Sequence, residues 1–109
     1  NLSKEKVIDL HGYSLDDANK KIYEFILSSF ENGVSRINII TGKGLRSKNM
    51  DNPYQSKDLS ILKYSIPNFI KNNKNLMSKI IKIDEDAIQS QSAGGFNILL
   101  KKNEKKNFT

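Results

Sequence analysis

The residues best equipped for chemistry lie near the start of the chain, in the stretch "VIDLHG" at positions 7–12. Asp9 interrupts an apolar run, and His11, the single histidine of the sequence, follows two positions later, directly before Gly12. A histidine can move a proton near neutral pH, and an aspartate can orient water or hold a divalent cation. The pair therefore has the residue types of a hydrolytic site.

We expect this pair on a buried strand over residues 7–11. Residues two apart on a strand face the same side, with their backbones roughly 6–7 Å apart. Asp9 and His11 would then reach one substrate group without hydrogen-bonding to each other. A structural alternative stays open, in which His11 caps the strand and Asp9 accepts backbone N–H bonds in the following turn.

A second motif, "TGKG" at residues 41–44, ends another apolar run. Gly42 and Gly44 allow the backbone to turn its N–H groups outward as an anion-binding nest, and Lys43 adds a positive charge. The motif is not a nucleotide P-loop, because no glycine stands five residues before Lys43 and Gly44 follows it instead of serine or threonine. Taken alone, it is more typical of a tight turn with a solvated lysine.

The elements between the two motifs bring them together. Ser14 can cap a helix that ends at Asn32-Gly33, and a second strand follows over residues 36–40. A strand, helix and strand in this order form a right-handed parallel crossover, so both motifs reach the edge where open α/β sheets bind ligands. With Arg46 and Lys48 close by, the pattern favours a phosphate-binding edge.

The rest of the chain completes a two-layer architecture. A polar stretch over residues 45–57 predicts a long loop, and a helix from about Asp58 should break or kink near Ser65-Ile66, because proline at position 67 disfavours a continuous helix. Apolar runs at 79–83 and 96–101 predict two more strands. The fold class is α/β, a β-α-β-α-β-β sandwich of two helices on a four-stranded mixed sheet, with one sheet face free to stay open. The expected organisation is a lead-in (1–6), one domain (7–101) and a basic tail (102–109).

The amino-acid composition limits the classes of partner and of chemical site that this protein can have. Eighteen basic residues stand against 12 acidic ones, and the net charge of +6 favours a polyanionic partner such as nucleic acid. The sequence has no cysteine, which excludes disulfides, cysteine-ligated zinc and a thiolate nucleophile. One histidine cannot build a histidine-rich zinc site, so Mg²⁺ or Mn²⁺ would be held by Asp9, water and substrate phosphate. No apolar run approaches a membrane span, and a cytoplasmic location with no membrane partner is expected.

The segments "IDLHG", "IITGKG", "ILKYSIPNFI" and "GGFNILLK" together resemble the small MutS-related (Smr) domain, in its stand-alone bacterial form, from about Val7 to Lys101. The resemblance implies the α/β sandwich also found in the C-terminal domain of bacterial translation initiation factor three. It also implies nucleic-acid binding, often with nicking of DNA and, in some relatives, cleavage of RNA. The family motifs map onto residues 9–12 and 41–44. Relatives often carry His-Gly-Gly-x-Gly-Ala before the last strand, whereas residues 93–97 here read Ala-Gly-Gly-Phe-Asn.

We therefore predict a nucleic-acid-binding domain with nicking endonuclease activity on DNA phosphodiesters. Asp9 would position water or a cation, and His11 would transfer a proton. The binding residues would be those of the turn and the basic loop: Gly12, Thr41 as a hydrogen-bond donor, Gly42, Lys43, Gly44, Arg46 and Lys48. The tail over residues 101–106 would follow the flanking backbone.

Two other functions stay open from the sequence. The first is a non-catalytic DNA- or RNA-binding module of the same fold, and the second is a protein-interaction domain with incidental charge. DNA is favoured over RNA as the partner, and a monomer is the expected state.

Overall fold

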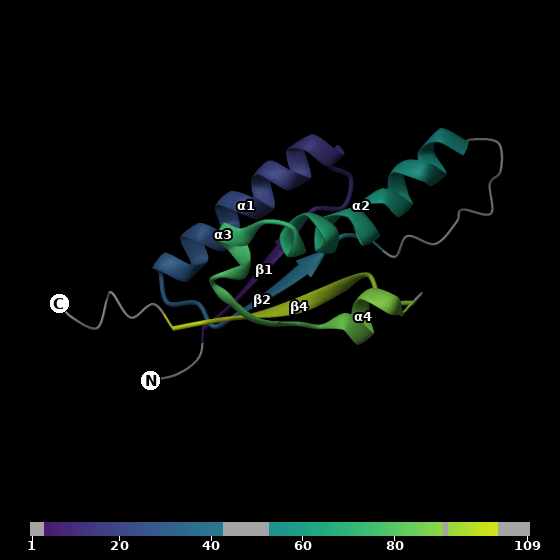
Figure 1. Cartoon of the computed structure of the whole chain (residues 1–109). Coiled ribbons are helices and arrows are strands. Elements are labelled where there is room, and N and C mark those ends of the chain that lie inside the picture. The colour runs from purple at the N-terminus through teal and green to yellow at the C-terminus, as the bar shows by residue number, and fades with distance from the viewer. Residues whose placement is uncertain (1–3, 43–52, 91, 103–109) are drawn as a thin grey trace.

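The computed structural model describes residues 4–42, 53–90 and 92–102, and side chains are described for these residues apart from 53–61. Its elements follow one another in the order β1 (Glu5–Asp9), α1 (Leu15–Glu31), β2 (Arg36–Ile40), α2 (Pro53–Lys71), α3 (Lys74–Met77), β3 (Ile80–Ile83), α4 (Glu85–Gln89) and β4 (Gly95–Leu100) (Figure 1). The predicted α/β class with a four-stranded mixed sheet is confirmed.

The strands lie in the order β1-β2-β4-β3. β1 and β2 are parallel, as expected for two strands joined by a crossover helix, and the other two pairs are antiparallel. Asp9 is level with Ile40 on β2, and Ile40 is level with Gly95 on β4. The ends of β1 and β2 and the beginning of β4 therefore share one edge of the sheet.

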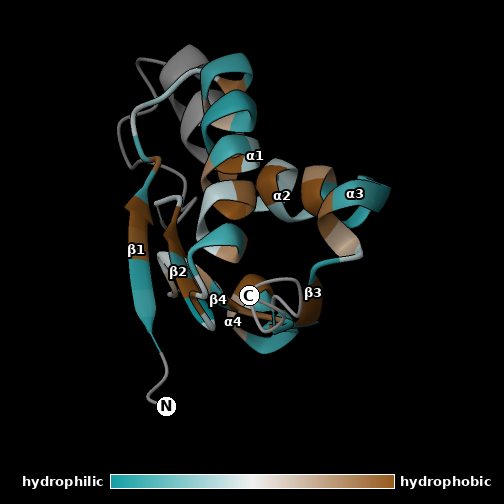
Figure 2. Ribbon diagram, turned by 90° about the vertical axis from the view of Figure 1, so that its left-hand side faces the viewer, coloured by the Kyte–Doolittle hydropathy of each residue, from teal (hydrophilic) through white to brown (hydrophobic). Residues whose placement is uncertain are grey.

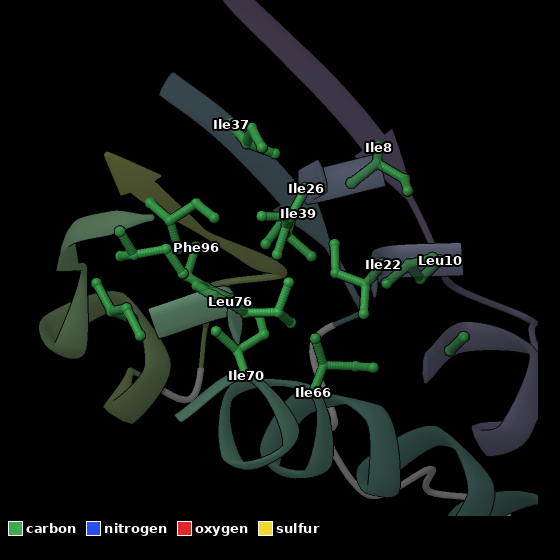
Figure 3. Close-up of a cluster of buried hydrophobic side chains, with 14 of the residues drawn as sticks. Ile8, Leu10, Ile22, Ile26, Ile37, Ile39, Ile66, Ile70, Leu76 and Phe96 are labelled. Carbon is green, nitrogen blue, oxygen red and sulfur yellow. The ribbon is translucent and has the colours of Figure 1, made fainter. Parts of the chain in front are cut away.

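The helices α1, α2 and α3 lie on one side of this sheet (Figure 1). The strands send alternate residues toward them, and Ile37 and Ile39 are fully buried there. Figure 3 shows these side chains meeting Ile22 of α1 and Ile66 of α2 in a single apolar core. On the opposite face Val7 remains 62% exposed, and no described helix covers it, so the sheet has an open face.

Helix α1 begins and ends where the sequence predicts. The Ser14 hydroxyl accepts a hydrogen bond from the Asp17 N–H at 3.2 Å, and Asp16 and Asp17 lie in the first turn, where the helix dipole favours acids. The chain turns at Gly33, whose φ is +78°. Hydrophobic and hydrophilic residues alternate along α1 in Figure 2, as expected for a helix that packs one face against a core.

Helix α2 differs from the prediction in two ways. It begins at Pro53, so residues 53–57 are helical and not part of a loop, and a proline is tolerated there because a first-turn N–H has no helical partner. The rest of the predicted loop, residues 45–52, lies outside the described residues. The helix also runs unbroken through Pro67 to Lys71. Ile66 and Ile70 are fully buried on either side of this proline, and their packing compensates for the lost backbone hydrogen bond.

Two short helices were not predicted. Asn73 caps α3 by accepting from the Leu76 N–H at 3.1 Å, and Asp84 caps α4 by accepting from the Ala87 N–H at 3.2 Å. Each is one of the residue types that favour helix starts. The predicted strands at 79–83 and 96–101 are confirmed to within one residue at each end.

Candidate nucleic-acid site

Asp9 and His11 are in direct contact, which corrects the expectation that they would not hydrogen-bond. Strand β1 ends at Asp9, and the chain then turns instead of staying extended. Leu10 anchors this turn, because its side chain is fully buried and its N–H donates to the Ile40 carbonyl at 2.7 Å. The His11 N–H donates to Asp9 Oδ1 at 3.0 Å, and His11 Nδ1 lies 3.0 Å from the same oxygen.

This contact sets the chemistry of the imidazole. A carboxylate oxygen can only accept a hydrogen bond, so Nδ1 carries the proton, and Nε2 is left as the proton-accepting nitrogen of the neutral ring. The side chains of His11 and Asp9 are 67% and 52% exposed, so a substrate can reach both. The hydrogen bonds from the His11 side chain and then from the His11 backbone lower the pKa of Asp9 below its ordinary value of 3.8. Asp9 is therefore a carboxylate at neutral pH.

Gly12 shapes the turn beside this pair. Its φ is +88°, a left-handed conformation that residues with a side chain rarely adopt, and the Tyr13 N–H closes the turn by donating to the Leu10 carbonyl at 3.0 Å. A Cβ at position 12 would meet nothing within 4 Å. The space next to His11 is open.

The second motif reaches the same edge of the sheet at Thr41 and Gly42. A Cβ built on Gly42 would lie 3.8 Å from the Cβ of His11, so the two segments adjoin as the sequence predicts. Thr41 is buried, and its hydroxyl donates to the Gly42 carbonyl at 3.1 Å. The N–H groups of Thr41 and Gly42 both donate to the Gly94 carbonyl, each at 3.0 Å. The Gly42 N–H is thus engaged within the protein and not directed at an anion.

The Gly94-Gly95 pair supports this second segment, and we did not single it out as part of a site from the sequence. A Cβ at Gly95 would lie 2.4 Å from the Ile39 carbonyl oxygen and 3.1 Å from Ile40 Cα. Only glycine lets β4 approach β2 so closely, and this approach brings the Gly94 carbonyl within reach of Thr41 and Gly42. The consecutive glycines were a visible signal for such a contact.

Lys63 of α2 holds the segment that precedes Gly94, and this role was not predicted from the sequence. The residue is only 3% exposed, and its Nζ donates to the carbonyls of Ser90 and Ala93 at 2.8 and 2.9 Å. Burial lowers the pKa of this lysine. Lys63 therefore fixes the segment that leads into Gly94, and its signal in the sequence was a lysine beside Leu62 on the buried side of an amphipathic helix.

The sequence as a whole matches one known protein family. The family model of the Smr domain matches residues 8–101 of the 109-residue chain. The chain belongs to the Smr domain family. Smr domains bind nucleic acids and often have nicking endonuclease activity. The searches of curated proteins and of solved structures gave no match.

Several residues predicted to bind phosphate in this Smr domain cannot be placed. Lys43, Gly44, Arg46 and Lys48 lie outside the described residues, as does the tail from residue 103. Lys101 and Lys102 are exposed and follow β4, at the end of the sheet opposite Asp9. No described helix of the Smr domain is long and apolar enough to cross a membrane.

The described donor atoms do not by themselves form a metal site. Among the described residues no group of three or more His, Cys, Asp or Glu side chains is placed to hold an ion. Asp9 offers a carboxylate, but its Oδ1 already accepts two hydrogen bonds from His11. This donor set suits orientation of the imidazole better than coordination of a cation.

Proposed function

We propose that this Smr domain binds nucleic acid at the edge formed by the ends of β1 and β2 and nicks DNA there with His11 and Asp9. The observation that carries the proposal is the 3.0 Å hydrogen bond between Asp9 Oδ1 and His11 Nδ1, in a pair that is exposed beside the second family motif. A carboxylate that holds a histidine in one tautomer is the arrangement used for general acid–base catalysis.

The proposed reaction uses His11 twice. Nε2 takes a proton from a water molecule as the water oxygen forms a bond to phosphorus. The imidazolium then donates that proton to the sugar oxygen as the phosphorus–oxygen bond breaks, so one strand is cut and the neutral imidazole is restored. Asp9 is a positioning residue in this scheme, because it orients the ring and stabilises the imidazolium.

Substrate binding is proposed to rest on the second half of the second motif and on the basic residues that follow it. Lys43, Gly44, Arg46 and Lys48 would contact phosphates, and Gly12 leaves space for the backbone of the strand. Contacts of this kind carry little base specificity. If about six phosphates of a DNA duplex are neutralised, affinity falls about a thousandfold between 50 and 200 mM salt.

Nicking of supercoiled plasmid tests the proposal. Wild type, Asp9→Asn, His11→Ala and the control Glu24→Gln, which changes an exposed acid on α1, are compared with Mg²⁺, with Mn²⁺ and with EDTA. General acid–base catalysis contributes about 10²–10⁴-fold, so His11→Ala should lose at least about a hundredfold in rate. Asp9→Asn should also be impaired, whereas Glu24→Gln should nick like wild type. Full nicking by His11→Ala contradicts the proposal, and the EDTA reaction tests the expectation from the sequence that Mg²⁺ or Mn²⁺ takes part.

A second candidate is a binding module without catalytic activity. It is favoured by the hydrogen bond from the His11 N–H to Asp9 Oδ1, since an aspartate commonly accepts such a bond in a turn without any catalytic role. It predicts that wild type and both site variants bind DNA equally and that none of them cuts DNA or RNA. Loss of cutting in His11→Ala with binding retained would contradict it.

A further inference from the structure

The open face of the sheet carries side chains in three rows that run across the strands. Residues level with one another on paired strands point to the same face, and residues two apart on one strand do so as well. The row nearest the active edge contains Asp9, Ile40 and Gly95, the middle row contains Val7, Asn38 and Asn97, and the far row contains Glu5, Arg36, Leu99 and Lys82. Asp9 therefore shares this face with Arg36 and Lys82.

The far row is positively charged. Arg36 and Lys82 are both exposed, and Lys101 is exposed two residues after Leu99. Glu5 is the only acid in this row, and its Oε2 lies 3.8 Å from Arg36 Nη1 in a pair open to water. Such an exposed ion pair is weak and is readily exchanged for a phosphate. The row offers a polyanion two separate cationic side chains.

The middle row is polar at its centre. Asn38 Nδ2 donates to Asn97 Oδ1 at 2.9 Å, and both residues are partly buried. An amide group has two donors and one acceptor, so this single hydrogen bond leaves Asn97 with both of its N–H donors and Asn38 with one donor and its oxygen. A sheet face built for an apolar partner would not place two amides at its centre. The remaining amide donors and the amide oxygen can form hydrogen bonds to phosphate oxygens, to sugar oxygens or to base edges.

The length of this face fits a short stretch of nucleic acid. Four residues separate the first row from the third, which is about 13 Å along a strand. That distance corresponds to about four nucleotides at the 3.4 Å rise of a duplex strand, and to fewer in an extended single strand. A strand cut at Asp9 and His11 would need only a few flanking nucleotides to reach Arg36 and Lys82.

We propose that the open face binds the nucleic-acid strand that flanks the phosphate at Asp9 and His11. Arg36 and Lys82 hold its phosphates, and the Asn38–Asn97 pair contacts it midway. The inference rests on the proposed function for the position of the reacting phosphate. A nucleic acid fits this face better than a second copy of the chain, since its charge complements the far row.

Salt-dependent binding of fluorescently labelled single-stranded DNA tests this path. The double variant R36Q/K82Q is compared with K20Q/K21Q, which removes the same charge from exposed positions of α1. Each phosphate contact to a single strand contributes about 0.7 to the slope of log K against log salt, so R36Q/K82Q should lower the slope by about 1.4 for an oligonucleotide of about twelve nucleotides. The control should keep the wild-type slope. With a dinucleotide, whose single phosphodiester cannot lie at Asp9 and at Arg36 at once, the variant and wild type should bind alike at the Asp9 edge.

The outcomes separate this inference from the proposed cleavage. A wild-type slope in R36Q/K82Q overturns the path along the sheet, even where His11→Ala shows that the site nicks DNA. A reduced slope supports the path, even where wild type cuts nothing. If sedimentation shows wild type as a dimer and R36Q/K82Q as a monomer, the face is an interface between copies of this chain, and the inference is wrong.

Discussion

The two segments that meet at the ends of β1 and β2 are held in different ways. The first, residues 9–12, is held mainly by local hydrogen bonds between His11 and Asp9, with one further bond from the Leu10 N–H to the Ile40 carbonyl of β2. The second, at Thr41 and Gly42, is held from outside by the Gly94 carbonyl, which accepts both backbone N–H groups. One side of the site is therefore a local turn, and the other depends on a distant part of the chain.

This difference decides what each side needs to keep its shape. The first segment requires an aspartate, a histidine and a glycine within four positions. The second requires Gly95, so that β4 lies close to β2, and Lys63, which fixes the approach to Gly94. Substitutions at Lys63 or Gly95, far from the site in sequence, should therefore disturb the second segment more than the first.

The largest expected effect is that of Gly95→Ala. The added Cβ would lie 2.4 Å from the Ile39 carbonyl oxygen, so β2 and β4 must separate. Overpacking of this kind costs typically 1–3 kcal/mol and sometimes more, and we expect about 3 kcal/mol in the free energy of unfolding from urea titration. Gly12→Ala is the matched change in the first segment, where φ is +88° but the space is open, and should cost about 1–2 kcal/mol. Equal losses in the two variants would remove the distinction between the segments.

Lys63→Met should have the next largest effect. It leaves the Ser90 and Ala93 carbonyls without their Nζ donor, at a cost of about 1–3 kcal/mol in unfolding free energy. Hydrogen exchange at the Thr41 and Gly42 amides should accelerate, while exchange at the His11 amide should not. The control Lys71→Met, which loses an exposed ion pair with Glu85, should cost less than about 1 kcal/mol. Unchanged exchange at Thr41 and Gly42 would show that Lys63 does not support the second segment.

The stabilising effect of Lys63 should also depend on pH. Because burial lowers its pKa in the folded protein below the ordinary 10.5, the unfolded chain binds more protons between the two pKa values. Stability from Lys63 therefore rises with pH through that range. The difference in unfolding free energy between wild type and Lys63→Met should widen from neutral pH toward 10.5, and a constant difference would contradict the burial of this charge.

Asp9→Asn should have the smallest effect on stability. The pKa of Asp9 is lowered by His11, so its stabilising contribution is fully present above the ordinary pKa of 3.8 and is lost as the pH falls through the lowered value. The pair is exposed, so the difference in Tm between wild type and Asp9→Asn should be small at pH 7 and should vanish in strong acid. A difference that grows below pH 3.8 would show that Asp9 is not held in this way.

The contrast between local and long-range contacts also explains which features could be predicted from the sequence. The helix from Ser14, the parallel pair of strands and the meeting of both motifs follow from local patterns, and all are confirmed. The Asp9–His11 hydrogen bond was predicted to be absent, because the strand was expected to continue through residue 11 and it ends at Asp9. A boundary two residues earlier was enough to change the chemistry of the pair.

Long-range contacts account for most of what the sequence did not predict. Pro67 stays within α2 because buried neighbours hold the helix in place, which no local pattern reveals. Lys63 and Gly95 act through segments distant in the chain, and their roles depend on which strands pair. The basic residues in and after the second motif remain predictions, because Lys43, Arg46 and Lys48 lie outside the described residues.

The central claim is that Asp9 acts through His11, and a double-variant cycle tests it most directly. Nicking rates are measured for wild type, Asp9→Asn, His11→Ala and the double variant, with binding to the same plasmid measured in parallel. Residues that act as one unit are strongly non-additive. The account predicts that the double variant is no slower than His11→Ala alone, with binding unchanged. Losses that multiply, or nicking at the wild-type rate in the double variant, would contradict it.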